Sequence, residues 1–343
     1  SCHRKPKRDC PNVERSKVMI RRNGMTVPLP GHLHAQRDKL AQLADWGFSD
    51  IWSAETDGAD AFTPLALAAA WEPRLRLGTA IVPAYTRTAP VIAQSVAAMA
   101  DAAPGRFAIG IGSSSNVIVE KWNGVPFLDP YKKVRDVVRF MHDAFSGEKI
   151  TKEYETFKVD GFRLSIKPEQ KPTILIAALR EGMLKLGARE ADGVIINWLS
   201  AEDVSKVAAV VHGAANGVEK EIAARIFVCP SENTEVVRAG ARFAIAAYMN
   251  VPVYADFHRW MGRAPLLQGM WDAWKAGDRK AALAAIPDQA VDELVVHGSA
   301  AHCRDRISEY FRNGVNTSSL AILPLDPEMD YWKAVESLSP SAE

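Results

Sequence analysis

Residues 76–115, RLGTAIVPAYTRTAPVIAQSVAAMADAAPGRFAIGIGSSS, contain a complete strand–helix–strand unit. The first strand, 76–82, is apolar without polar alternation, as expected of a strand covered on both faces. Pro90 suits the first turn of a helix over 91–101, and Pro104-Gly105 ends that helix. The second strand, 106–111, opens into a Gly-Ser loop. Ligands of α/β folds bind at the carboxyl ends of parallel strands, so this loop is a candidate binding site.

The same alternation continues along the chain and predicts a (β/α)8 TIM barrel. Strands are expected near 25–29, 50–53, 76–82, 106–111, 173–177, 193–197, 225–229 and 318–323. Helices are expected near 34–46, 63–71, 91–101, 131–146, 180–190, 201–213, 234–248 and 302–313. Eight strand signals spread over about 300 residues favour a closed barrel over an open doubly wound sheet.

One domain, 25–330, should hold the barrel together with two insertions. Residues 151–168 alternate with period two around Asp160-Gly161 and predict a β-hairpin. Residues 249–300 contain two further helical stretches and are too long for a plain loop, so they should form a lid or packing layer over one barrel end. Residues 331–343 are interpreted as a C-terminal tail.

The composition is that of a globular protein, with 48% hydrophobic and 24% charged residues. Residues 1–24 carry eight Lys/Arg against two acidic residues, whereas the remainder has 34 basic against 39 acidic residues. The folded part therefore shows no nucleic-acid surface. The basic segment lacks the apolar core of a secretory signal and is interpreted as a disordered leader or a mis-assigned start, with Met19 or Met25 as the true beginning.

No apolar run is long enough for a transmembrane helix. The four cysteines form neither a disulfide framework nor a zinc pattern, and no histidine–carboxylate cluster has metal-ligand spacing. A cytoplasmic protein without a metal is expected. The chain also lacks a GxSxG elbow and a GxGxxG opening its first βα unit, so any chemistry should come from a bound cofactor.

Several stretches resemble the luciferase-like flavin and deazaflavin oxidoreductases. Besides the opening stretch they are LADWGFSDIWSAE (43–55), VEKWNGVPF (119–127), ILIAALREGMLKLGAREADGVIINWL (174–199) and DRISEYFRNGVNTSSLAILP (305–324). The resemblance covers most of residues 25–325 and is strongest to the actinobacterial branch that uses coenzyme F420, an 8-hydroxy-5-deazaflavin. The resemblance implies an oxidoreductase that moves a hydride between F420 and a small organic substrate, and a homodimer. An FMNH2-dependent two-component monooxygenase and a non-catalytic F420- or flavin-binding protein are the alternatives.

Within this resemblance, Glu55 is the candidate catalytic residue, because it follows the second strand and should reach the barrel mouth. A carboxylic acid buried beside an apolar ring can exchange a proton at neutral pH. Capping or surface exposure is the alternative for Glu55, and Asp57 is a weaker candidate. Sugar-phosphate relatives have histidine here, and its absence argues against that substrate class.

The resemblance also suggests cofactor contacts. Ala80-Ile81 should form a non-proline cis peptide whose bulge supports the ring, and Ser113 and Ser114 should bond the ring edge or side chain. The amides around Ala178, Leu179, Arg180 and Glu181 open a helix and suit a phosphate. Relatives often have glycines at the first two of these positions. Asn197 could bond the ring, and the expected substrate-pocket residues are His32, Trp52, Trp122 and Trp198.

Overall fold

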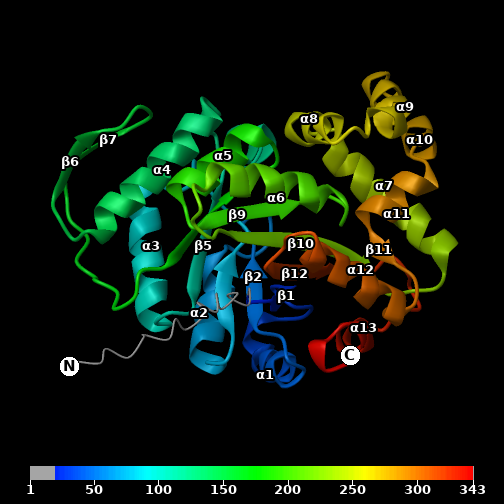
Figure 1. Cartoon of the computed structure of the whole chain (residues 1–343), viewed down its shortest axis with the longest axis horizontal. Helices are drawn as coiled ribbons and strands as arrows, with labels where there is room; N and C mark the ends of the chain where they lie inside the picture. The colour runs from blue at the N-terminus through cyan, green and yellow to red at the C-terminus, as the bar shows by residue number, and fades with distance from the viewer. Residues whose placement is uncertain (1–19, 343) are drawn as a thin grey trace, which may run out of the picture.

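Eight parallel strands close into a barrel at the centre of the molecule (Figure 1). The structure is a computed structural model and describes residues 20–342. The barrel strands are β1 (Arg22–Thr26), β2 (Asp50–Ser53), β3 (Arg76–Thr79), β5 (Phe107–Gly112), β8 (Thr173–Ala177), β9 (Gly193–Asn197), β10 (Glu221–Cys229) and β12 (Thr317–Ile322). They pair in chain order, and β12 returns to β1. The predicted (β/α)8 barrel is confirmed.

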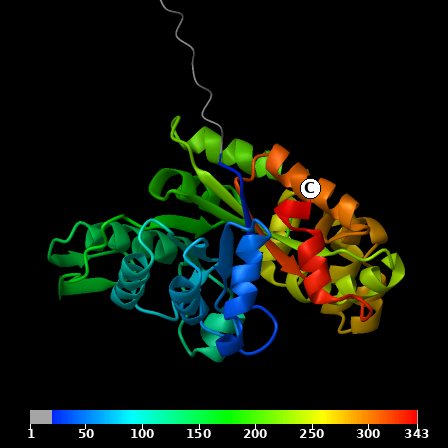
Figure 2. The ribbon, with the colours of Figure 1, turned by 90° about the horizontal axis from the view of Figure 1, so that it is seen from below.

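Helices surround these strands, and both views show them as an outer layer (Figures 1 and 2). They are α1 (Arg37–Asp45), α2 (Phe62–Trp71), α3 (Ala89–Ala102), α4 (Pro130–Phe145), α5 (Glu181–Glu190), α6 (Asp203–Ala214), α7 (Thr234–Met249) and α12 (Ala300–Arg312). Two small strands extend the sheet: β4 (Val82–Pro83) pairs with β5, and β11 (Val296–His297) pairs with β10. Each predicted helix is present within a few residues of its expected bounds.

The barrel begins earlier than the sequence predicts. β1 starts at Arg22, which pairs with Thr317, so residues 22–24 belong to the barrel and not to a leader. A chain starting at Met25 would lose more than half of this strand. The rest of the predicted leader, residues 1–19, lies outside the described residues.

The hairpin exists, but its turn is not where the sequence predicts it. β6 (Ile150–Glu153) and β7 (Lys158–Phe162) pair antiparallel, and the turn between them is closed by the Tyr154 N–H donating to the Phe157 carbonyl at 2.8 Å. Gly161 lies within β7 at φ +75°, next to a register shift of the ladder. The Asp-Gly pair therefore marks a bulge, a site that also favours glycine.

The second insertion contains four helices where two were expected. They are α8 (Pro252–Trp260), α9 (Ala264–Lys275), α10 (Arg279–Ala284) and α11 (Asp288–Leu294). These helices lie with α7 at the opposite side of the molecule from the β6–β7 hairpin (Figure 1). Buried residues of this segment form a second core against α7 and the end of β10.

The predicted C-terminal tail is part of the folded structure. Helix α13 (Tyr331–Ser337) contributes Ala334 and Val335 to the main core. Its Trp332 ring lies 6.1 Å from that of Trp46, at the end of α1, and these two helices are neighbours in Figure 2. A short 3-10 helix, Pro340–Ala342, follows. The apolar face of α13 explains why this segment packs on the barrel base.

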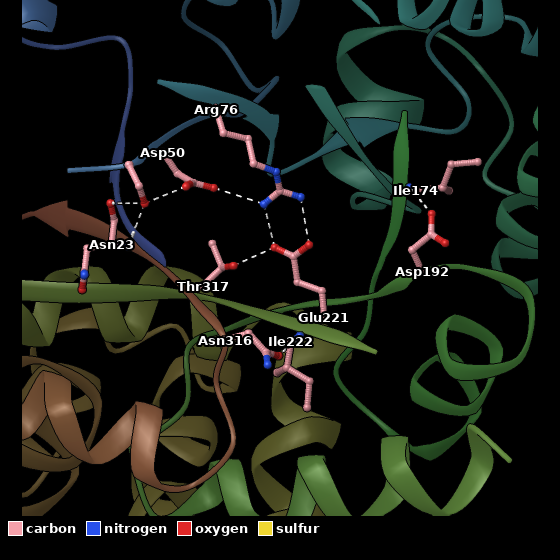
Figure 3. A network of polar contacts seen from close by, with 10 residues as sticks. Asn23, Asp50, Arg76, Ile174, Asp192, Glu221, Ile222, Asn316 and Thr317 are labelled. Carbon is pink, nitrogen blue, oxygen red and sulfur yellow. Dashed lines mark hydrogen bonds and ion pairs between the residues drawn. The ribbon is translucent and has the colours of Figure 1, made fainter. Parts of the chain in front are cut away.

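A polar network closes the amino end of the barrel interior (Figure 3). Arg76, the first residue of β3, donates two hydrogen bonds of 2.8 Å to Glu221 of β10 and one of 3.1 Å to Asp50 of β2. Thr317 of β12 donates to the same glutamate at 2.6 Å. Arg76 has two carboxylate partners in the barrel base, which satisfies its buried charge.

Trp52 fills the layer above this network and is only 1% exposed. A Cβ on Gly78 would lie 2.3 Å from its ring, so glycine makes room for the indole. Trp52 packs with Ala108, Leu175 and other apolar residues inside the barrel. Its assignment to the substrate pocket is therefore wrong for this conformation: the indole is core that supports the mouth from below.

Candidate functional site

The carboxyl end of β3 carries an unusual backbone feature. β3 ends at Thr79, the Ala80–Ile81 peptide is cis, and the strand resumes at Val82 as β4. The Ala80 N–H donates to the Ser53 carbonyl at 2.5 Å, and the Glu55 N–H donates to the Ile81 carbonyl at 3.2 Å. The predicted cis peptide is confirmed, and the loop after β2 holds it in place.

Gly112, at the end of β5, allows Ile81 and Ala177 to lie where a larger residue would have its side chain. A Cβ at this position would lie 2.6 Å from Ile81 Cδ1 and 2.9 Å from Ala177 Cβ. Such distances are too short for ordinary carbon contacts, so only glycine allows the ends of β4, β5 and β8 to approach in this way. The glycine of the Gly-Ser loop therefore shapes the barrel mouth.

The serines after Gly112 have different surroundings. Ser115 Oγ accepts a 3.3 Å hydrogen bond from the Ile118 N–H and so caps the π-helix Val117–Trp122. Ser113 and Ser114 are partly exposed at the mouth, and Ser114 has φ 62°. Non-glycine residues in this left-handed region cluster at functional sites. Ser113 and Ser114 are thus placed where a ligand in the mouth can reach them.

The loop between β8 and α5 offers fewer free groups than predicted. The Ala178 N–H already donates to the Ile195 carbonyl at 2.9 Å, so this amide is not available to a phosphate. Glu181 begins α5, whose first-turn amides lack partners within the helix. The Arg180 side chain is 48% exposed and lies 3.5 Å from the Asp256 carboxylate of α8. The Leu179–Glu181 segment keeps the geometry of an anion site at a helix start.

Asn197 is the last residue of β9, and Trp198 follows it. Asn197 donates from Nδ2 to the Tyr254 hydroxyl at 3.0 Å, and its buried Oδ1 has no hydrogen-bond partner. Trp198 has φ 54° and is 1% exposed, and its ring stacks on Phe227 with 3.9 Å between centroids. The assignment of Trp198 to the substrate pocket is therefore wrong for this conformation. Its indole anchors the second core instead.

Glu55 reaches the mouth, but its carboxylate is fully engaged. Arg87, in the loop before α3, donates to Glu55 Oε1 at 3.1 Å and to Oε2 at 2.9 Å. The Ala61 N–H donates to Oε2 at 3.0 Å. Both oxygens of the Glu55 carboxylate thus accept hydrogen bonds from within the chain. These contacts favour a role in positioning the loop under the cis peptide over the predicted proton exchange.

Replacing Glu55 and Arg87 singly and together measures this coupling. We expect Glu55→Gln and Arg87→Met each to lower the free energy of unfolding by about 1–2 kcal/mol, since both groups are partly buried and charge-paired. The double variant should lose less than the sum of the two. Urea denaturation of the wild type, the two single variants and the double variant gives the coupling energy between Glu55 and Arg87. Additive losses would contradict a stabilising Glu55–Arg87 pair.

The remaining pocket candidates lie at the surface. His32 is exposed in the turn before the 3-10 helix Leu33–Ala35, and its ring stacks on that of His34 at 5.6 Å. Trp122 is 54% exposed at the end of the π-helix. Asp57 is exposed in the loop after β2. The contribution of His32 and Trp122 to a substrate pocket stays a prediction.

A buried histidine ties the α8 segment to the barrel. His258 is 0% exposed, and its Nδ1 lies 3.4 Å from Arg263, which also pairs with Asp203 of α6 and Glu293 of α11. Burial, together with the Arg263 charge, lowers the pKa of His258 to about 3. His258 is therefore neutral in the folded protein at every mildly acidic pH.

This residue should make the fold acid-sensitive. Below pH 6.5 the unfolded chain protonates His258 and the folded chain does not, so the stability contribution is full above pH 6.5 and falls as the pH drops towards 3. Between pH 6.5 and 5 the free energy of unfolding should fall by about 1–2 kcal/mol through this group. Urea denaturation at both pH values should show a smaller fall for His258→Gln. If the free energy of unfolding fell equally in the wild type and in His258→Gln, His258 would not be the source of the acid sensitivity.

Sequence reasoning missed three residues of the mouth: Arg87, Arg225 and Tyr254. No sequence pattern pointed to Arg87, because its partner Glu55 is 32 residues away along the chain. Tyr254 lies in an insertion whose packing no local pattern reveals. Arg225 did carry a signal, because it shares the inward face of β10 with Glu221 and Ala223, at a spacing of two residues within an apolar strand.

Among the described residues, no three His, Cys, Asp or Glu side chains are grouped so that they could hold a metal ion. Over the same range, no helix has both the length and the apolar character needed to cross a membrane.

Comparison with known proteins agrees with this geometry. The family model described as luciferase-like monooxygenase matches residues 17–317. A Mycobacterium tuberculosis protein provisionally named a coenzyme F420-dependent oxidoreductase is 26% identical over 316 residues, which covers 83% of this chain and 89% of the relative. The F420-dependent glucose-6-phosphate dehydrogenase of Kineococcus radiotolerans is 31% identical over 179 residues, about half of each chain.

Among solved structures, the coenzyme F420-dependent tetrahydromethanopterin reductase from Methanopyrus kandleri superimposes with a TM-score of 0.76. The match covers 94% of this chain and 98% of the reductase at 19% identity. At this identity the likeness concerns the fold, and it extends over nearly the whole barrel with its insertions.

Proposed function

We propose, given that this chain belongs to the luciferase-like monooxygenase family, that it is an oxidoreductase that uses coenzyme F420 and a small organic substrate. Its similarity to F420-dependent oxidoreductases supports the choice of coenzyme. The observation that carries the placement of the site is the close approach of Ile81 and Ala177 that Gly112 allows, at the carboxyl end of the barrel. When bound, the deazaflavin supplies a hydride-exchanging carbon, C5, and the protein supplies orientation and electrostatics.

The residues around the mouth suit such a group. The Ala80–Ile81 bulge, which Gly112 allows to lie close against Ala177, would support an apolar ring. The free Oδ1 of Asn197 would accept a hydrogen bond from the ring edge, with Ser113 and Ser114 near the adjoining chain. The amides from Leu179 to the first turn of α5 would bind the phosphate, with Arg180 beside them.

In this proposal the protein itself orients the coenzyme and surrounds it with packed side chains. Glu55 fixes the loop that supports the cis peptide, through Arg87 and the Ala61 amide. Trp52 and the Arg76 network fill the barrel interior beneath the mouth. Helix α8 brings Tyr254 into contact with Asn197 at the end of β9. Homodimer formation and a cytoplasmic location stay predictions.

The FMNH2-dependent monooxygenase remains the alternative, since the matching family model is described as a luciferase-like monooxygenase. Parallel fluorescence titrations with F420 and with FMN, at one ionic strength, separate the two. We expect binding of F420 at micromolar concentration or tighter, with FMN at least tenfold weaker. A preference for FMN would replace the proposal by the monooxygenase. Binding of F420 without turnover in a substrate screen with reduced coenzyme would favour a carrier protein.

A further inference from the structure

Arg225 is a partly buried cation whose charge no carboxylate of the described chain neutralises. It follows Glu221 and Ala223 on the inward face of β10; Glu221 crosses the barrel base to Arg76, and Ala223 packs in the barrel interior. Two residues further along, Arg225 therefore points into the barrel at its carboxyl end. Its Nε is buried and has no hydrogen-bond partner. Such an orphaned donor is unfavourable unless something else occupies its partner position.

The other buried arginines show what this chain provides where an arginine serves the fold. Arg76 pairs with Asp50 and Glu221, and Arg263 pairs with Asp203 and Glu293. Each of these guanidinium groups has two carboxylates. Within the part of the chain that the structure describes, Arg225 has none within ion-pair distance. The difference indicates that the described residues do not supply the anionic partner of Arg225.

The groups around Arg225 are neutral and polar or aromatic. Its guanidinium carbon lies 5.0 Å from the centre of the Phe227 ring. Burial lowers its pKa, and the hydroxyls of Tyr248 and Tyr254 act in the opposite direction. Asn197 is its register neighbour on β9 and bonds the Tyr254 hydroxyl. Burial also raises the pKa of Tyr254 to about 12, so this phenol keeps its proton and can donate it.

The strand order places Arg225 across the mouth from the cis peptide. Three strands separate β3 from β10 on either side of the closed barrel. The bond from Arg76 to Glu221 shows directly that these two strands face each other across the interior. A ring lying on the Ala80–Ile81 bulge would therefore have Arg225 on its open side, where the substrate must enter.

We propose that Arg225, together with the Tyr254 hydroxyl that Asn197 holds in place, binds a carboxylate of the substrate, so that the substrate is an organic acid. A guanidinium presents paired N–H donors that match the two oxygens of a carboxylate, and in a water-poor site this pairing is strong. The hydroxyl of Tyr254 adds a third donor. This inference rests on the proposed function, because it assigns the open side of the coenzyme to the substrate.

Carboxylate and amide probes of equal shape test it. Acetate, benzoate and 3-phenylpropionate would be compared with acetamide, benzamide and 3-phenylpropionamide by calorimetric titration of the F420-loaded enzyme, at constant ionic strength. We expect at least one carboxylate to bind tenfold or more tightly than its amide. Arg225→Met should abolish this preference, Arg225→Lys should keep part of it, and Tyr254→Phe should weaken carboxylate binding several-fold.

Two further measurements on the same variants separate the alternatives. F420 affinity should stay within about threefold in Arg225→Met, and its thermal midpoint without ligand should be equal or higher, since an unpaired buried charge is removed. Equal binding of carboxylates and amides by the wild type would overturn the inference. So would a tenfold loss of F420 affinity, which would make Arg225 a coenzyme ligand, or a lowered midpoint, which would give it a structural role. Failure of the wild type to bind F420 would instead refute the proposed function.

Discussion

Replacing Arg76 by methionine is expected to lower the free energy of unfolding by about 3–5 kcal/mol, because it leaves two buried carboxylates without their cation. Asp50 is fully buried, and Glu221 has a side chain that is only 13% exposed. The arginine and the hydroxyl of Thr317 lower the pKa of Glu221 against the effect of burial. Without Arg76 both acids must bind protons or admit water at the barrel base. Urea denaturation followed by tryptophan fluorescence measures the loss.

An exposed arginine provides the matched control. Arg139 forms a two-pronged pair with Glu190 on the outer helices, with a side chain that is 47% exposed. Arg139→Met should cost no more than about 1 kcal/mol, because solvent screens the pair. Adding Glu221→Gln to Arg76→Met should recover part of the stability. If the Arg76 and Arg139 variants lost equal amounts, the network of Figure 3 would not be a stabilising part of the barrel base.

Replacing Gly112 by valine should weaken F420 binding by at least about fivefold. The new Cβ would displace Ile81 or Ala177, which border the cis peptide, and such overpacking typically costs about 1–3 kcal/mol. A loss of this size in binding corresponds to about fivefold to 150-fold in affinity. Fluorescence titration with F420 measures the change, and circular dichroism confirms that the variant is folded.

Gly213→Ala is the control for this second prediction. Gly213 lies on the exposed side of α6, and nothing lies within 4 Å of an added Cβ. The substitution should leave F420 affinity unchanged and raise stability by about 0.4–1 kcal/mol, as glycine-to-alanine changes do in compatible helices. Unaltered F420 affinity in Gly112→Val would place the coenzyme away from the cis peptide.

The barrel could be predicted because each strand and helix carries a local signal. Apolar runs such as Phe107–Ile111 and amphipathic helices such as α4 depend on residues near in sequence. Segments whose structure depends on distant contacts were predicted less well. Asp160-Gly161 favours a turn locally, but the turn lies five residues earlier, where Tyr154 stacks on Phe157. The tail was missed because the surface that covers α13 belongs to α1 and the barrel base.

The features of the candidate site also divide into those that the sequence predicts and those that depend on distant contacts. The cis peptide and the Gly-Ser loop follow from motifs that resemble a family, and the structure has both where they were expected. The roles of Trp52 and Trp198 could not be inferred from composition, since a tryptophan at a strand end can line a cavity or fill the core. Glu55 was placed correctly at the mouth, but its engagement depends on Arg87 from a different loop. Partners of this kind become visible only in three dimensions.

A crystal structure of the chain with F420 bound tests the central claim most directly, because that claim concerns where the coenzyme lies. We expect the deazaflavin ring to contact Ala80 and Ile81, the phosphate to contact the amides that begin α5, and Arg225 to face the open side of the ring. A ring bound outside the barrel mouth, or a coenzyme phosphate paired with Arg225, would contradict this account.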